Sequence, residues 1–96
     1  MQILERNAQT DPLTGLFNRK YLEKYIETSL YTGRWKNIPC GLMMVDIDFF
    51  KQVNDVYGHQ AGDKVLVYFS ELLREELRAT DIIGRFGGEE FIVALP

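Results

Sequence analysis

Hydrophobic positions recur with helical spacing in three segments of the chain. Over residues 18–30 they repeat every three to five positions, which predicts an amphipathic helix with Asn18 as its N-cap. Similar spacing over 61–77 predicts a longer helix, and 49–57 favours a short one that ends at Gly58. The apolar positions behind the two longer helices are Tyr21, Leu22, Tyr25, Ile26, Leu30, Val65, Leu66, Phe69, Leu72, Leu73 and Leu77.

Three further segments have the pattern of β-strands. Residues 41–47 are a short, nearly continuous apolar run with an acid near its end, which predicts a strand buried on both faces. Residues 81–86 and 90–95 predict a hairpin in which Gly87 and Gly88 make a tight turn. The order helix, strand, helix and hairpin predicts an α/β or α+β fold.

Length and composition indicate one globular domain. The chain has 96 residues, of which 46% are hydrophobic and 26% charged, values typical of a folded soluble domain. A proline, a glycine and small polar residues at 11–16 favour a turn that interrupts any preceding helix. We therefore interpret residues 1–10 as the end of an upstream signalling helix or a linker, and 11–96 as the domain.

Charge and cysteine content exclude several classes of function. The net charge of −3 argues against a nucleic-acid-binding face, although a nucleotide can still bind through metal ions and backbone N–H groups. Cys40 is the only cysteine, which excludes an internal disulfide and a multi-cysteine metal site. No apolar run approaches the roughly 18 residues of a membrane span, so we expect a cytoplasmic protein and no membrane contact by this segment.

Two acidic clusters are the first candidates for chemistry. Asp46 and Asp48 lie at the end of the first predicted strand, and Glu89 and Glu90 follow the predicted hairpin turn. If the two strands are neighbours, the carboxylates converge and repel one another unless a hard divalent cation binds between them. The alternative is that the aspartates cap the next helix and the glutamates are solvated at a loop tip.

Residues near the first acidic cluster have the groups needed to bind a nucleotide. Residues 49–51 begin a helix, whose first N–H groups are available to a phosphate, although two phenylalanines at a helix start also pack as ordinary core. Asn54 and Asp63 offer the amide and carboxylate that match the edge of guanine, and each is also typical of a cap or turn. His59 has no second histidine or nucleophile, so we assign it no catalytic role.

Three motifs in order resemble the GGDEF domain family. Gly-Gly-Glu-Glu-Phe at 87–91 resembles the family's signature in its Glu-for-Asp form. Residues 11–19 resemble the opening turn, and 46–51, together with Asn-Asp at 54–55, Gly-His at 58–59 and Gly-Asp at 62–63, resemble the central block. Three motifs at the family's spacing make a chance match improbable.

The resemblance implies a diguanylate cyclase, which condenses two GTP molecules into cyclic di-GMP with loss of pyrophosphate. It implies a partial palm-like cyclase fold, with a central, mainly antiparallel sheet flanked by helices and the C-terminal part of the domain absent. Mg²⁺, or Mn²⁺ in its place, would bind Asp46, the Ile47 carbonyl and Glu89. Glu89 would also be the candidate base for the ribose 3′-OH, with Glu90 as a supporting acid. The implied substrate-binding residues are Phe49, Phe50, Lys51, Asn54, Asp63, Gly88 and Arg85, of which Arg85 would steady the hairpin turn.

The resemblance also implies partners and regulation. Each domain of the family holds one GTP, so a homodimer is needed for catalysis, and we expect little activity from this chain alone. Arg78 and Asp81 resemble an Arg-x-x-Asp site at which the product, cyclic di-GMP, inhibits the enzyme, although a helix dipole also explains an arginine there. Two alternatives stay open: a degenerate module that binds GTP or cyclic di-GMP without turnover, and a unit for folding or interaction only.

Overall fold

The order of elements in the computed structural model is the predicted one. The structure describes residues 9–31 and 41–95, so Cys40 and all of the predicted upstream segment except residues 9 and 10 lie outside the described part. The mixed helix and strand class is confirmed. The elements are α2 (Arg19–Tyr31), β1 (Gly41–Asp46), α3 (Phe50–Tyr57), α4 (His59–Glu76), β2 (Ile82–Arg85) and β3 (Glu90–Leu95).

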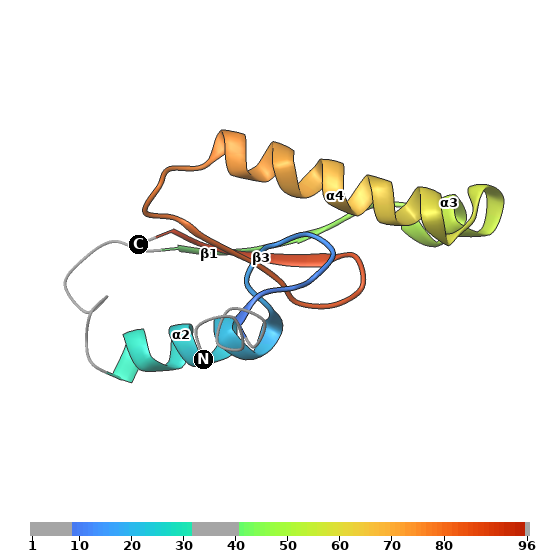
Figure 1. Cartoon of the computed structure of the whole chain (residues 1–96). Coiled ribbons are helices and arrows are strands. Elements are labelled where there is room, and N and C mark those ends of the chain that lie inside the picture. Colours follow the sequence, from blue (N-terminus) through green and yellow to red (C-terminus); the bar gives the residue numbers. More distant parts are fainter. Residues whose placement is uncertain (1–8, 32–40, 96) are drawn as a thin grey trace.

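The three described strands form one antiparallel sheet with β3 in the middle. The strand order is β1-β3-β2, and the register pairs Asp46 with Glu90 and Arg85 with Phe91. The sheet lies between helices, with α3 and α4 on one side and α2 on the other (Figure 1). This topology places the end of β1 beside the start of β3, which is where the two acidic clusters occur in the sequence.

The hydrophobic core lies between the sheet and α4. Leu66 of α4 packs with Phe91 and Val93 of the central strand, and all three side chains are buried. Phe69 adds a ring contact with Phe91, at 5.2 Å between centroids. The remaining buried members of this core are Leu16, Phe50 and Ile83. The helix predicted over 61–77 is confirmed as α4. It begins earlier, at His59, because Gly58, at φ 90°, turns the chain from α3 directly into α4.

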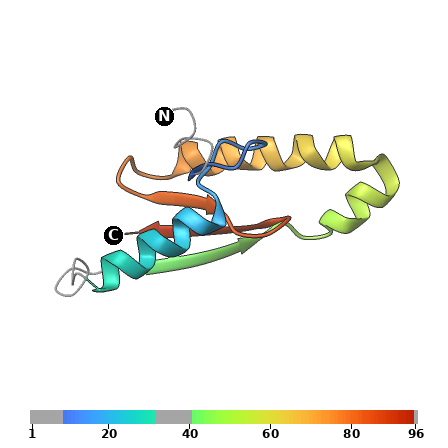
Figure 2. The same ribbon diagram turned by 60° about the horizontal axis from the view of Figure 1, so that its bottom comes forward.

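The helix α2 approaches the sheet closely at Gly84. Asn18 caps the helix as predicted, since its side-chain Oδ1 accepts a hydrogen bond of 2.9 Å from the Tyr21 N–H. Leu22 is fully buried, and a Cβ at Gly84 would lie only 2.8 Å from its Cδ2 atom. The missing side chain at Gly84 therefore lets α2 lie close to β2. In the turned view, α2 lies in front of the sheet (Figure 2).

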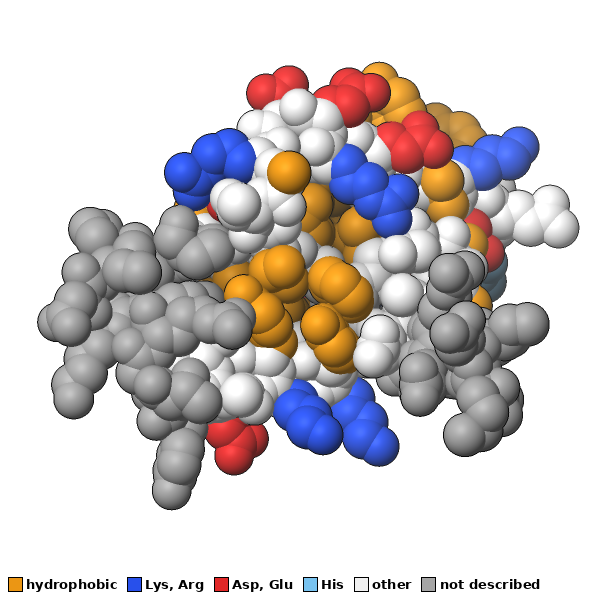
Figure 3. Space-filling model, turned by 60° about the vertical axis from the view of Figure 1, so that its left-hand side comes forward, with side chains coloured by type: hydrophobic (Ala, Val, Ile, Leu, Met, Phe, Trp, Pro, Cys, Tyr) orange, Lys and Arg blue, Asp and Glu red, His pale blue; other side chains and the backbone are white. Residues whose placement is uncertain are grey.

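The prediction that the first strand is buried on both faces is wrong. Leu42, Met43 and Met44 of β1 are all exposed, and Met44 reaches 62%. In the described sheet β1 is an edge strand, and α2 makes its main sheet contact with β2. Apolar side chains also gather in the middle of the face drawn in Figure 3. Within the described sheet, β1 is therefore an open edge with exposed apolar side chains.

The predicted tight turn at Gly87 and Gly88 is a wider loop in the structure. β2 ends at Arg85 and β3 begins at Glu90, so four residues, 86–89, join them. The Phe86 N–H donates to the Glu90 carbonyl at 2.7 Å, which closes the wider loop. Neither Gly87 nor Gly88 has the positive φ that a type I′ turn requires at both central positions. The lack of a side chain at Gly87 instead leaves space for the Glu90 carboxylate, and the position beside Gly88 is open.

Candidate functional site

The two acidic clusters meet at one end of the sheet. Asp46 ends β1 and pairs in register with Glu90, and the Ile47 N–H donates to the Glu89 carbonyl at 3.3 Å. A hollow of about 430 Å³ opens at this point, within the roughly 300–1,000 Å³ range of small-ligand sites. Its lining residues are Asp46, Ile47, Asp48, Phe49, Phe50, Lys51, Gln52 and Glu89.

The hollow brings together most of the predicted metal and phosphate residues. Three acidic side chains line it, and Lys51 is the one basic residue among its lining residues. Among the described residues, no group of three or more His, Cys, Asp and Glu side chains is arranged to hold a metal ion. Two carboxylates and the Ile47 carbonyl nevertheless fit Mg²⁺, which binds few protein oxygens and keeps positions for water or phosphate. The metal ligands themselves stay a prediction.

The segment between β1 and α3 has an unusual backbone conformation. Phe49 is the N-cap of α3 and adopts φ 60° and ψ 22°, in the left-handed region, without a side-chain cap. That conformation costs roughly 1–2 kcal/mol for a residue with a Cβ. The first N–H groups of a helix have no intrahelical acceptors, and residues 50–52 line the hollow. Phe50 packs into the core, whereas the Phe49 side chain is exposed. The alternative that these phenylalanines pack as ordinary core therefore holds for Phe50 but not for Phe49.

Asn54 lies between α3 and α4 with an unpaired oxygen. Its side-chain Oδ1 is buried and has no hydrogen-bond partner in the structure. The carboxamide sits directly above Gly62, where a Cβ would overlap it. A buried acceptor without a partner costs about 1–3 kcal/mol. The role of Asn54 in binding guanine stays a prediction. Asp63 is exposed and lines a separate hollow on α4 with Leu13 and Tyr68.

Gly62 provides a direct test of this packing. We expect Gly62→Ala to destabilise the chain by about 1–3 kcal/mol, because the new methyl group overlaps Asn54 and lies 3.2 Å from the Phe50 ring. Gly88→Ala is the matched control, since nothing lies within 4 Å of its Cβ position. Urea denaturation of both variants measures the difference. Equal stability of the two variants would contradict the close contact between α3 and α4.

The hairpin loop is held by Arg85. Its Nε and Nη2 atoms donate to the Gly88 carbonyl at 3.1 and 2.9 Å, so the guanidinium holds this side of the loop. Its Nη1 atom forms an ion pair with Asp11 at 3.2 Å. The Glu90 carboxylate lies against Gly87, where a Cβ would collide with it. Arg85 therefore connects the opening turn of the domain to the loop that positions Glu89.

Asp11 is a positioning residue to which sequence reasoning gave no individual role. Its carboxylate accepts hydrogen bonds from the Thr14 N–H at 2.9 Å and the Thr14 hydroxyl at 2.8 Å, as well as the Arg85 contact. Phe17 follows the turn at 11–16 and pairs with β2, since the Arg85 N–H donates to the Phe17 carbonyl at 2.9 Å. The spacing of Asp11 and Thr14 predicts a local turn. The contact with Arg85 joins residues far apart in the sequence, so no local pattern predicts it.

The ionisation of Asp11 should make stability depend on pH. Partial burial opposes ionisation, but the hydrogen bonds from Thr14 and the Arg85 charge outweigh it and hold the Asp11 pKa below its ordinary 3.8. A carboxyl with a lowered folded-state pKa stabilises the fold above its unfolded pKa and loses that contribution as pH falls through the folded value. We expect Asp11→Asn to be less stable than the parent at pH 7, with the difference shrinking below about pH 4. Urea denaturation between pH 2 and 7 measures this, and a constant difference would contradict it.

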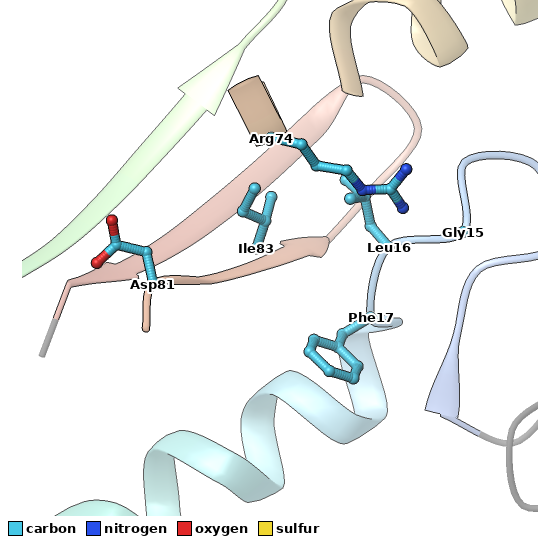
Figure 4. A pocket seen from close by; sticks show the side chains of 6 residues that line it. All are labelled: Gly15, Leu16, Phe17, Arg74, Asp81 and Ile83. Carbon is cyan, nitrogen blue, oxygen red and sulfur yellow. The ribbon is translucent and has the colours of Figure 1, made fainter. Parts of the chain in front are cut away.

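The predicted inhibitory pair lies at the opposite end of β2. α4 ends at Glu76, and Asp81 folds back to accept hydrogen bonds from the Arg78 backbone N–H at 2.8 Å and from its guanidinium at 3.1 Å. The side-chain hydrogen bond from Arg78 lowers the Asp81 pKa. Asp81 also borders a hollow of about 180 Å³. Figure 4 shows Asp81 and Arg74 on opposite sides of that hollow, with Ile83 between them.

Comparison with known proteins identifies the family. The model of the GGDEF domain, described as diguanylate cyclase, matches residues 8–96. The chain therefore belongs to the GGDEF family. It is 48% identical over 91 residues to the diguanylate cyclase DgcP of Pseudomonas aeruginosa and 43% identical over 89 residues to the response regulator PleD of Caulobacter vibrioides. These regions are 95% and 93% of this chain but 14% and 20% of the two relatives.

Solved structures have the same fold. The diguanylate cyclase SiaD of Pseudomonas aeruginosa, solved with its activator SiaC, matches with 43% identity and a TM-score of 0.87 over 99% of this chain and 36% of SiaD. The coiled coil and GGDEF domain of DgcB from Caulobacter crescentus, solved with c-di-GMP, matches with 32% identity and a TM-score of 0.91. That match covers 99% of this chain and 50% of DgcB.

The described part of this chain has no helix of the length and hydrophobicity needed to cross a membrane.

Proposed function

We propose that this chain carries the GTP and metal site of a diguanylate cyclase domain, which condenses two GTP molecules into cyclic di-GMP with release of pyrophosphate. The observation that carries the proposal is the meeting of Asp46 and Glu89 in one hollow at the start of α3. Membership of a family of diguanylate cyclases supports the reaction class. The Gly-Gly-Glu-Glu-Phe form of the signature keeps a carboxylate at both acidic positions.

The chain's own groups divide the task between binding and proton transfer. Asp46, Glu89 and the Ile47 carbonyl would hold Mg²⁺ or Mn²⁺, which supplies charge stabilisation to the phosphates and makes the 3′-OH more acidic. The first N–H groups of α3 and Lys51 bind the phosphates. The Asn54 oxygen would accept from the guanine edge, whereas Asp63, which resembles a second guanine-binding residue, lines a separate hollow on α4. The open space beside Gly88 admits the nucleotide.

Ring closure is a pair of identical displacements. In each, the Glu89 carboxylate takes the proton of a ribose 3′-OH while the oxygen attacks the α-phosphorus of the other GTP. One oxygen–phosphorus bond forms as the bond to pyrophosphate breaks, and pyrophosphate leaves with the electron pair. Glu90 supports the site by packing against Gly87 and pairing its backbone with Asp46. Two such sites must face each other, so the reaction needs a homodimer.

We also propose that the 96-residue chain alone turns GTP over slowly. Its candidate hollow is lined by one basic residue, Lys51, whereas a triphosphate carries several negative charges. Each missing charge-assisted contact typically costs about 1.5–3 kcal/mol, and about 1.4 kcal/mol corresponds to a factor of ten in rate. The solved relatives are longer chains than this one. The SiaD chain is about three times as long as the region that it shares with this chain.

Regulation by the product is the second part of the proposal. Arg78 and Asp81 form a preassembled pair in which the Arg78 side chain is 68% exposed and the Asp81 side chain 2%. DgcB was solved with c-di-GMP. A guanidinium binds phosphate or a guanine edge, and a carboxylate accepts from guanine N–H groups. Because the two residues already pair with each other, the ligand must compete with that internal contact. The same pair supports the alternative function, a module that binds cyclic di-GMP without turnover.

A chimera tests the proposed reaction. Residues 9–95 would replace the matched region of SiaD, and the chimera would be incubated with SiaC, GTP and Mg²⁺. Chromatography should detect cyclic di-GMP and pyrophosphate, and Glu89→Gln in the chimera should abolish both. If the chimera folds and binds cyclic di-GMP but yields no product, the site of this chain is a binding module and the catalytic proposal is wrong.

A further inference from the structure

A cation lies over the aromatic ring at the start of the hairpin loop. The Cζ atom of Arg19 is 4.1 Å from the centre of the Phe86 ring, well inside the roughly 6 Å at which a guanidinium is attracted to an aromatic face. Arg19 is the first residue of α2, and Phe86 follows the end of β2 directly. The contact therefore joins the start of α2 to the loop, residues 86–89, that carries Glu89.

The Arg19 guanidinium is held in place by a second contact. Its Nε atom donates to the Glu23 carboxylate at 2.8 Å, one helical turn further along α2. Asn18 caps the same helix through the Tyr21 N–H, so the backbone that carries Arg19 is also held. Contacts within α2 therefore fix both the backbone and the charged group of Arg19.

The position of Arg19 does little for α2 itself. A cation in the first turn of a helix opposes the helix dipole, and an arginine four residues before a glutamate is the weaker order for such a pair. The Arg19 and Glu23 side chains are 60% and 54% exposed, and ion pairs at such exposure contribute little to stability. Helix stability therefore does not explain an arginine at this position, whereas the contact with Phe86 does.

The loop needs a side chain that anchors it, because its two glycines supply none. A glycine restricts the backbone less than any other residue, and nothing lies within 4 Å of the Cβ position of Gly88. The pairing of β2 with β3 ends at Arg85. The Phe86 N–H donates to the Glu90 carbonyl at 2.7 Å, so the placement of Phe86 affects the strand that begins beside Glu89. The Phe86 ring is therefore the last side chain before Glu89 that can hold the loop by packing.

We propose that Arg19 is a positioning residue for Glu89: the guanidinium holds the Phe86 ring, and the ring holds the loop in the conformation that presents Glu89 to the hollow. This inference rests on the proposed function, because it assigns Glu89 to a metal ion. Arg19 does not line the hollow, so it acts through the loop and not on the metal or the nucleotide. Its loss should weaken metal binding about two- to fivefold, the equilibrium factor to which an exposed cation–π contact corresponds.

A double-mutant cycle with Mn²⁺ affinity as the readout tests this inference. We expect Arg19→Gln and Phe86→Leu each to raise the Mn²⁺ dissociation constant about two- to fivefold, measured by electron paramagnetic resonance at a temperature where every variant is folded. The double variant should bind no more weakly than the weaker single variant, because both changes remove the same contact. Arg19→Lys and Phe86→Tyr keep a cation and a ring, so they should bind Mn²⁺ nearly as tightly as the parent. Lys20→Gln is the matched control, since it removes the same charge from an exposed neighbour in the first turn of α2.

The outcomes separate this inference from the proposed function. An Arg19→Gln effect on Mn²⁺ affinity that is absent in the Phe86→Leu background, with parent affinity in Lys20→Gln, would support the positioning role. Parent affinity in Arg19→Gln, whatever its melting temperature, an equal loss in Lys20→Gln, or additive losses in the double variant would overturn the inference and leave the proposed function standing. Failure of the parent chain to bind Mn²⁺, or equal affinity in Glu89→Gln, would instead overturn the proposed function and this inference with it.

Discussion

Replacing Phe91 by alanine should remove about 3–5 kcal/mol from the free energy of unfolding, the range for a buried phenylalanine. Phe91 is fully buried in the central strand, where it packs with Leu66 and Val93 and contacts the Phe69 ring. Domains of this size are stable by about 5–15 kcal/mol, so the loss is a large share of the total. Urea denaturation followed by circular dichroism measures it.

Tyr68→Ala is the control for the Phe91 variant. Tyr68 is an aromatic residue on α4 with an exposed side chain, and surface substitutions usually change stability by less than about 0.5 kcal/mol. A loss below about 1 kcal/mol for Phe91→Ala would mean that the core does not lie between β3 and α4, because the cavity left by a missing ring there cannot be filled without cost.

Glu89→Gln should weaken the binding of Mn²⁺ at least a hundredfold, with little change in melting temperature. Substituting a residue that only hydrogen-bonds a metal ligand lowers metal affinity about 10–100-fold. Glu89→Gln removes the charge of a proposed ligand itself, so we expect a larger effect. Glutamine keeps the size of the side chain, and the loop is held by Arg85 and the Glu90 backbone rather than by the Glu89 carboxylate. Electron paramagnetic resonance of free Mn²⁺ measures the affinity directly, and competition with Mg²⁺ extends it to that ion.

The matched control for the metal prediction is Glu71→Gln. Glu71 is an exposed acid on α4 that borders a different hollow, so the same change of charge there should leave Mn²⁺ affinity unchanged. Equal affinities in the parent and Glu89→Gln would remove Glu89 from the metal site. A large fall in melting temperature in Glu89→Gln would point to a structural role for the carboxylate instead.

Local patterns in the sequence predicted the elements well, because helical spacing and caps act over a few residues. The Asn18 cap and the stripe of α4 are of this kind. The burial of β1 could not be predicted in the same way, since it depends on which strand α2 covers. An apolar run shows that a strand is suited to burial, but the position of a helix distant in the sequence decides whether it is buried.

The candidate site was predictable in part for the same reason. The acids at both strand ends were found from the sequence, and the register of β1 with β3 brought them together. The ion pair between Asp11 and Arg85 joins residues 74 positions apart, and the unpaired oxygen of Asn54 depends on the close approach of two helices at Gly62. Such contacts arise from the fold, and single-sequence patterns do not encode them.

Calorimetric titration of the 96-residue chain with GTP, with and without Mg²⁺, tests whether the hollow at the end of β1 binds a guanine nucleotide through a metal ion. We expect binding of GTP that requires Mg²⁺ and that falls strongly in Glu89→Gln. We also expect weaker binding of ATP, because adenine lacks the N1–H and 2-amino donors of guanine that the Asn54 oxygen would accept. Binding of equal strength with and without Mg²⁺, or equal affinity for ATP and GTP, would contradict a metal-dependent guanine nucleotide site at the end of β1.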